Sequence, residues 1–117
     1  MDLKKLIKIL KYSDDADHLA SQIVTFLLRD EPDVMRIRDV VKLLSIGKNA
    51  IDKWIVLGRL KVIRSRGHIY ITKTDLVDYL SSVYFRGSQH KNEFRKNLLE
   101  LMEIAVISEM KKEESNG

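Results

Sequence analysis

Apolar residues recur at helical spacing in two short stretches near the middle of the chain. In the first, from about Arg38 to Leu44, they lie three and four positions apart, at Ile37, Val40, Val41 and Leu44. The second runs from about Lys48 to Leu57, and its inward face carries Ile51, Trp54 and Ile55. Only Ser45, Ile46 and Gly47 separate the two stretches. The pattern therefore predicts two helices crossing over a tight turn, with Ile46 plugging the space between them and Gly58 ending the second helix.

After Gly58 the apolar period changes from 3.6 to 2. The β-branched and aromatic runs Val62–Arg64 and Ile69–Ile71 flank Ser65–His68, which predicts a hairpin with Gly67 at a position of positive φ. Thr72 then reads as the N-cap of a third helix that ends near Phe85, with an apolar face of Leu76, Tyr79, Leu80 and Val83. Two helices, a basic hairpin and a capped helix in this order predict a winged helix-turn-helix. The second helix of this fold is free to enter a DNA major groove.

These residues resemble the excisionase or MerR-type winged helix-turn-helix family over about two fifths of the chain. The positions that match the family pattern are Val40, Leu43, Leu44, Ile46, Trp54, Ile55, Gly58, Leu60, Arg64, Gly67, Ile71, Asp75, Leu76, Tyr79 and Leu80. The resemblance implies site-directed DNA binding, with Lys48, Asn49, Ala50 and Lys53 at recognition-helix positions and Arg64 and Arg66 on the wing.

Five positions, in three places, depart from the family pattern. Ser45 stands where the family prefers glycine, and Gly47 stands where it prefers a serine cap. Asp52 places a carboxylate on the reading face, where it could accept a hydrogen bond from a cytosine amino group but would repel phosphates. Val56 and Leu57 replace a polar pair. We therefore expect another part of the chain, or a partner, to cover the end of this helix.

The charge distribution supports a nucleic-acid interface in the same segment. Residues 36–73 contain ten basic and two acidic side chains, a net charge of +8, whereas residues 1–35 and 74–117 each carry −2. Positive charge concentrated in this way is typical of a surface that neutralises phosphates. We expect Arg36, Arg38 and Lys42 to contact the flanking backbone and His68 to supply a donor at the wing tip. The predicted DNA-binding residues are therefore Arg36, Arg38, Lys42, Lys48, Asn49, Ala50, Asp52, Lys53, Arg64, Arg66 and His68.

Helices are predicted on both sides of this segment. Residues 2–11 place Leu3, Leu6, Ile7 and Leu10 opposite four lysines, and a second helix is expected from Ser13 to about Arg29 with Leu19, Ala20, Ile23, Phe26 and Leu27 inward. Arg86–His90 reads as a loop or kink, and Lys91 to about Lys112 as a long helix that is apolar over most of its circumference. Such a helix either forms a homodimer or completes a monomeric core with the N-terminal helices. The tail from Lys111 to Gly117 is expected to be disordered.

The fold class predicted is mainly α with a small β-hairpin wing. The predicted segments are an N-terminal helical extension (1–33), a winged helix-turn-helix DNA-binding domain (34–85), and a C-terminal oligomerisation helix with a disordered tail (86–117). Asp14, Asp15, Asp17 and His18 are better explained by helix capping than by metal binding, so we expect no metal and no cofactor. The chain lacks phosphate-binding, dinucleotide and nucleophile motifs, and an enzyme is not predicted.

The absence of cysteine, of a signal peptide and of an apolar run of about 18 residues predicts a cytoplasmic, nucleoid-associated protein without membrane contact. The function expected is sequence-specific binding of double-stranded DNA by a small transcriptional regulator or a recombination or architectural factor, acting as a homodimer. Two alternatives remain open. One is an oligomeric adaptor of a DNA packaging or partition machinery, and the other is a winged helix that binds protein through Val56 and Leu57.

Overall fold

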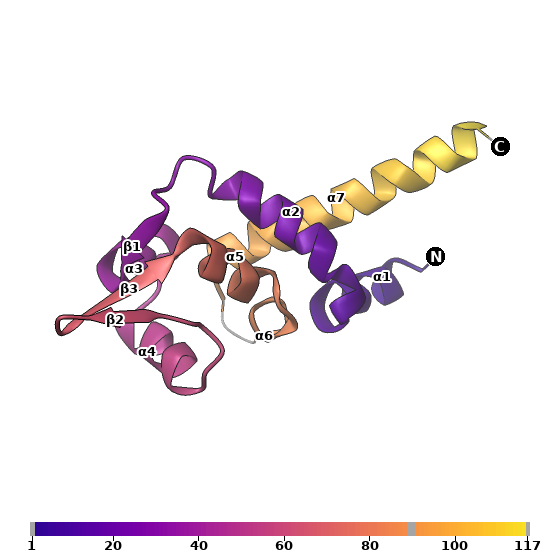
Figure 1. Ribbon diagram of the computed structural model, residues 1–117. Helices are drawn as coiled ribbons and strands as arrows, with labels where there is room; N and C mark the ends of the chain where they lie inside the picture. The colour runs from indigo at the N-terminus through magenta and orange to yellow at the C-terminus, as the bar shows by residue number, and fades with distance from the viewer. Residues whose placement is uncertain (1, 89–90, 117) are drawn as a thin grey trace.

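The computed structural model, which describes residues 2–88 and 91–116, has the predicted winged helix-turn-helix at its centre. Helices α3 (Ile37–Leu44) and α4 (Lys48–Val56) are followed by strands β2 (Ile63–Ser65) and β3 (His68–Thr72) and by helix α5 (Lys73–Ser81). Figure 1 shows α3, α4 and the strands at one end of the molecule and the remaining helices at the other. The predicted fold class, mainly helical with a small β wing, is confirmed.

The sheet contains one strand more than the sequence pattern predicted. Strand β1 (Val34–Arg36) pairs antiparallel with β3, which gives the order β1-β3-β2. Met35 lies opposite Ile71 in this pairing, and both side chains are buried. A strand of three residues is too short to show alternation in sequence, so only its long-range partner defines it. This pairing ties the base of the wing to the start of α3.

The hairpin turn has the geometry that the sequence predicted. Ser65 pairs with His68, so Arg66 and Gly67 form a two-residue loop, and both have positive φ, 51° and 79° respectively. Positive φ at both central positions is the type I′ arrangement, whose twist matches that of the two strands. The turn therefore fixes the direction in which the wing tip projects.

The turn between α3 and α4 contains two of the departures from the family pattern, Ser45 and Gly47. Ser45 is the C-cap of α3 and adopts a left-handed conformation with φ 52° and ψ 45°, a region that glycine enters without steric penalty. Gly47 is the N-cap of α4 and provides no side-chain cap. Gly58, just after α4, has φ 72°, as expected of the residue that ends this helix.

Helix α5 is shorter than predicted. The Thr72 hydroxyl accepts a hydrogen bond from the Asp75 N–H at 3.0 Å, which confirms the predicted N-cap. The helix ends at Ser81, and after Ser82 a short helix α6 (Val83–Arg86) takes a new direction, so the single helix expected up to Phe85 is wrong. The Ser82 hydroxyl donates to the Tyr79 carbonyl at 2.6 Å. This local bond replaces a helical one and stabilises the break.

The N-terminal segment forms α1 (Leu3–Tyr12), a 3₁₀ turn η1 (Asp14–Ala16) and α2 (Asp17–Leu27). Ala20, Val24 and Leu28 are fully buried at spacings of four residues, whereas Phe26 is exposed, so its predicted inward position is wrong. The Phe26 ring instead lies under the Arg29 guanidinium at 4.1 Å. Ala20, Leu19 and Ile23 face the core as predicted, and the core also contacts Val24 and Leu28.

Arg86 joins the three segments of the chain from a fully buried position. Its guanidinium donates to the main-chain oxygens of Ser81 (2.8 Å), Ser13 (3.0 Å) and Leu10, and it pairs with the Asp17 carboxylate. The Arg86 carbonyl accepts a hydrogen bond from Arg95 Nε at 2.8 Å. The expectation that Arg86 lies in a loop is wrong, because it ends α6 inside the protein.

Helix α7 (Glu93–Asn116) begins beside the helix-turn-helix and projects past the other end of the body (Figure 1). At its start, Asn92 Nδ2 donates to the Leu44 carbonyl at 2.8 Å. Leu98 and Met102 are fully buried, and the helix contacts α1, α2 and α6, so part of it completes the core of a single chain. The expectation of a disordered tail from Lys111 is wrong as far as Asn116, which is helical. His90, expected to be a loop residue, and Gly117 lie outside the described residues.

Candidate nucleic-acid interface

The outer face of α4 carries the predicted reading residues. Lys48, Asn49 and Lys53 are exposed, and Ala50 and Asp52 are half-buried. On the opposite face Ile51 is fully buried. Trp54 packs on Tyr79 with ring centroids 4.5 Å apart, which fixes the rotation of α4 about its axis. Lys48, Asn49 and Lys53 are therefore presented outward, whereas Ala50 lines a separate hollow with Trp54 and Phe85.

Lys48 and Asp52 interact with each other on α4. Lys48 Nζ lies 3.3 Å from the Asp52 carboxylate, one helical turn away. An exposed pair of this kind contributes only a few tenths of a kcal/mol. A DNA ligand can therefore separate the two side chains easily, which leaves Lys48 available for phosphate or base contacts.

The wing presents a second group of donors. Arg64, Arg66 and His68 are all exposed, and no residue of β2 is buried. The side chains of an exposed hairpin projecting beside a helix can reach the DNA backbone or minor groove while the helix occupies the major groove.

Arg36 connects the wing to the start of α3. Its Nη2 lies 2.9 Å from His68 Nδ1, its guanidinium lies 5.2 Å from the centre of the Tyr70 ring, and its main-chain N–H donates to the Asp39 carboxylate at 2.9 Å. A groove of about 280 Å³, which we name the basic groove, is lined by Arg36, Ile37, Arg38, Lys48, Gly67, His68 and Ile69. Four predicted DNA-binding residues from distant parts of the sequence thus meet in one concave site.

Lys42 is separate from that site. It lines a different hollow, with Glu31, Pro32, Asp39 and Leu43. Two of these neighbours are acidic, so the electrostatic environment of Lys42 is less favourable to phosphate than that of the basic groove. Lys42 therefore lies apart from the predicted residues that share the groove.

The apolar end of α4 is not covered by the described part of the chain. Val56 is 84% exposed and Leu57 is 50% exposed. Covering by another segment of the same chain, one of the two expectations for these residues, does not occur among residues 2–88 and 91–116. A partner is the expectation that remains.

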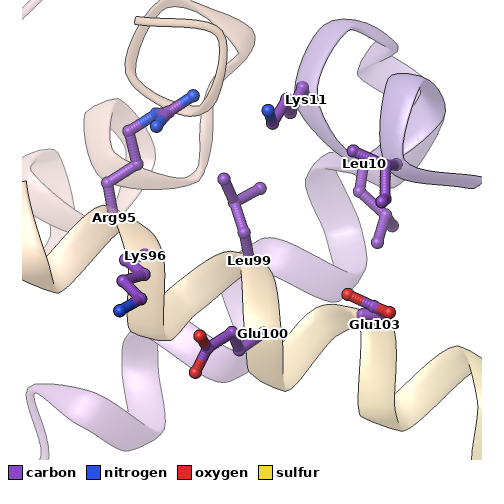
Figure 2. A pocket seen from close by; sticks show the side chains of 8 residues that line it. Leu10, Lys11, Arg95, Lys96, Leu99, Glu100 and Glu103 are labelled. Atoms are coloured by element: carbon purple, nitrogen blue, oxygen red, sulfur yellow. The ribbon is translucent and has the colours of Figure 1, made fainter. Parts of the chain in front are cut away.

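Sequence patterns did not predict a second groove, between α1 and α7. In Figure 2, Leu99 points from α7 into the space bordered by Leu10 and Lys11 of α1. The groove, of about 270 Å³, has a mixed lining of Ile7, Leu10, Lys11, Arg95, Lys96, Leu99, Glu100 and Glu103. Burial lowers the pKa of Arg95. Because charges of both signs alternate here, the groove does not favour an anion.

Among the described residues, no group of three or more His, Cys, Asp or Glu side chains is arranged to hold a metal ion, and no helix is long and apolar enough to span a membrane. Asp17, part of the acidic cluster near the N-terminus, is engaged by Arg86.

Comparison with known families identifies the central segment. Residues 34–83 match the family model described as a helix-turn-helix domain, in agreement with the excisionase-type resemblance of this segment. No match was found among curated proteins or among solved structures. Helix-turn-helix domains are typical of DNA-binding regulatory proteins, and their second helix is the one that contacts base edges.

Proposed function

We propose that this protein binds double-stranded DNA in a sequence-specific manner as a small transcriptional regulator or recombination factor. In this proposal α4 enters the major groove with Lys48, Asn49 and Lys53, of which Asn49 and Lys53 contact base edges and Lys48 contacts a base edge or the backbone. Ala50 and Asp52 are also assigned to the reading face. Arg64 and Arg66 contact the backbone or the minor groove. The observation that supports the proposal is that the basic groove brings together Lys48 of α4, His68 of the wing, and Arg36 and Arg38.

We further propose that the protein acts inside the cell as a homodimer formed through α7. Of the apolar residues on this helix, Leu101 and Ile104 are exposed, at 37% and 62%, and the helix projects beyond the body of the chain (Figure 1). A second copy related by a two-fold axis could cover both positions. Two recognition helices about 34 Å apart would then favour an inverted repeat with one half-site per protomer.

The decisive experiment is selection from a randomised duplex pool, followed by fluorescence anisotropy at two salt concentrations. Arg64→Ala combined with Arg66→Ala should weaken binding and reduce the slope of log K against log salt by up to about 2, since each phosphate contact contributes about 0.9. The matched control is Lys5→Ala combined with Lys8→Ala. It removes the same charge from exposed positions of α1 and should leave the selected sequence and its affinity nearly unchanged.

Other outcomes would favour the alternatives. Salt-dependent binding without a preferred sequence, together with assembly beyond a dimer, would favour an adaptor of a packaging or partition machinery. Absence of duplex binding at low salt would refute the main proposal and leave the protein-binding alternative. That alternative is favoured by the exposure of Val56 and Leu57. Replacing both with serine should then abolish the partner interaction, whereas the wing variants should not.

A further inference from the structure

In the basic groove, Arg36 and His68 hold each other in place. Arg36 is fixed at three points: by Asp39 through its main chain, by the Tyr70 ring, and by His68 through its guanidinium. A long basic side chain on an open surface ordinarily loses rotamer freedom when it binds a ligand. For Arg36 much of that loss has already occurred in the free protein.

The contact between Arg36 and His68 also determines where the histidine carries its proton. Arginine remains protonated and has only donors, so Arg36 Nη2 must donate and His68 Nδ1 must accept. The imidazole is then neutral, with its proton on Nε2, at the opposite side of the ring. His68 thus has a free donor whose direction is set by Arg36.

Charge in the groove favours an anion. The lining contains the cations Arg36, Arg38 and Lys48 together with the His68 donor, and it contains no acidic side chain. Within the described part of the chain, Arg38 has no hydrogen-bond or ion-pair partner. Lys48 is the first residue of α4, whose first turn has no acidic residue and no side-chain cap. The positive end of this helix is therefore not compensated locally.

We infer that the basic groove is a preformed seat for one phosphate of the DNA backbone, at the point where a strand passes from the recognition helix to the wing. Arg38, Lys48 and the His68 Nε2–H would donate to the phosphate oxygens, and Arg36 would act as a positioning residue that orients His68 and holds the wing against α3. A phosphodiester fits because the groove lies between the two elements proposed to contact DNA. This inference rests on the proposed function and adds a defined contact to it.

The test uses the selected duplex with single methylphosphonate linkages, which remove the charge of one phosphate at a time. One position in each half-site should lower the affinity of the wild-type protein by about tenfold, the effect expected of losing one phosphate contact with charged donors. In Arg38→Ala the same linkage should change the affinity less than about twofold, because the groove no longer distinguishes a charged from an uncharged linkage. Lys42→Ala, outside the groove, should keep the full sensitivity.

Two histidine variants separate the donor from the ring. His68→Gln keeps an N–H donor near the position of Nε2, so the methylphosphonate linkage should still lower its affinity in part. His68→Phe keeps an aromatic ring without a donor, so its affinity should be less sensitive to that linkage. The role of Arg36 is read from the nitrogen chemical shifts of His68. They should report the Nε2–H tautomer in the wild type and a mixture of tautomers in Arg36→Lys, even if both proteins are equally folded.

The outcomes distinguish this inference from the proposed function. Suppose that the wild type binds a selected duplex, but that no methylphosphonate linkage has a smaller effect on affinity in the Arg38 and His68 variants than in the wild type. The phosphate site is then refuted, and the DNA-binding proposal is unaffected. If no duplex binds, the DNA proposal fails, and inorganic phosphate provides the remaining test. Phosphate-dependent shifts of the His68 imidazole that disappear in Arg38→Ala would assign the groove to a small anion, which overturns the backbone assignment. Their absence would refute an anion site of any kind.

Discussion

Replacing Arg86 with methionine should destabilise the protein more than any other single exposed or buried arginine change. Methionine fills similar space but removes every donor, so the oxygens of Leu10, Ser13 and Ser81 and the Asp17 carboxylate lose a charged partner. Removing one member of a buried ion pair destabilises by about 3–5 kcal/mol. The Asp17 side chain is 46% exposed and regains water, which places the expected loss near the lower limit, at about 3 kcal/mol.

Urea denaturation followed by circular dichroism measures this loss. With a slope typical of a domain of this size, the midpoint should fall by roughly 2 M. Arg29→Met is the matched control. It makes the same chemical change at an exposed site where the guanidinium contacts Phe26, and it should alter stability by about 0.5 kcal/mol or less. The loss of stability in Arg86→Lys should lie between those of Arg86→Met and Arg29→Met, because one ammonium group cannot reach all four acceptors.

A loss below about 1 kcal/mol for Arg86→Met, equal to that of Arg29→Met, would refute the reasoning. It would mean that the buried guanidinium is no better solvated by its protein partners than by water. The same variant also tests connectivity, because Arg86 links α6 to the N-terminal helices and to α7. Amide hydrogen exchange should accelerate in α1 and at the start of α2 before it does so in α4 and β3.

Three further predictions concern the turn, the core and the projecting helix. Ser45→Gly should raise the free energy of unfolding by about 0.5 kcal/mol in urea, because glycine adopts φ 52° without strain but loses more chain entropy; a lower stability would contradict this. Burial raises the pKa of Tyr79 to about 12, so the unfolded chain loses this proton at a lower pH than the folded protein does. The free energy of unfolding should therefore be unaffected by this group below pH 10 and should fall by about 1–2 kcal/mol as the pH rises from 10 to 12. Tyr79→Phe should abolish this fall, and Tyr84→Phe should not. Ile104→Glu should convert a dimer into a monomer in sedimentation velocity, whereas Lys96→Glu should not, and a monomeric wild type would refute dimerisation through α7.

The candidate site could be predicted from sequence as a set of residues but not as an arrangement. Asn49 and Lys53 follow directly from helical periodicity, because each lies two residues from the buried Ile51 and therefore on the opposite side of the helix. Lys48 is exposed because it is the first residue of α4. Arg38 and Lys42 lie one helical turn apart on α3, and only the packing of the wing against this helix shows that Arg38 lines the basic groove and Lys42 does not. This packing depends on the pairing of β1 with β3, which no local pattern indicates.

The interpretation of His68 shows the same limit. The sequence placed it at the wing tip as a donor, and only the neighbouring Arg36, 32 residues away, shows which of its nitrogens can donate. Val56 and Leu57 are apolar where the family pattern has a polar pair, which the sequence shows directly. Whether another segment covers them could be learned only from the packing of the whole chain.

Local chemistry by itself determined the winged helix-turn-helix, because caps, left-handed residues and apolar periodicities act over a few residues and agree at Gly58, Gly67 and Thr72. Tertiary structure decided the third strand, the buried position of Arg86 and the meeting of Arg36 with His68. Each of these depends on a partner far away in the sequence or on which polar group finds an acceptor after the core has packed. Their stabilisation comes from burial and pairing, which no short window of sequence contains.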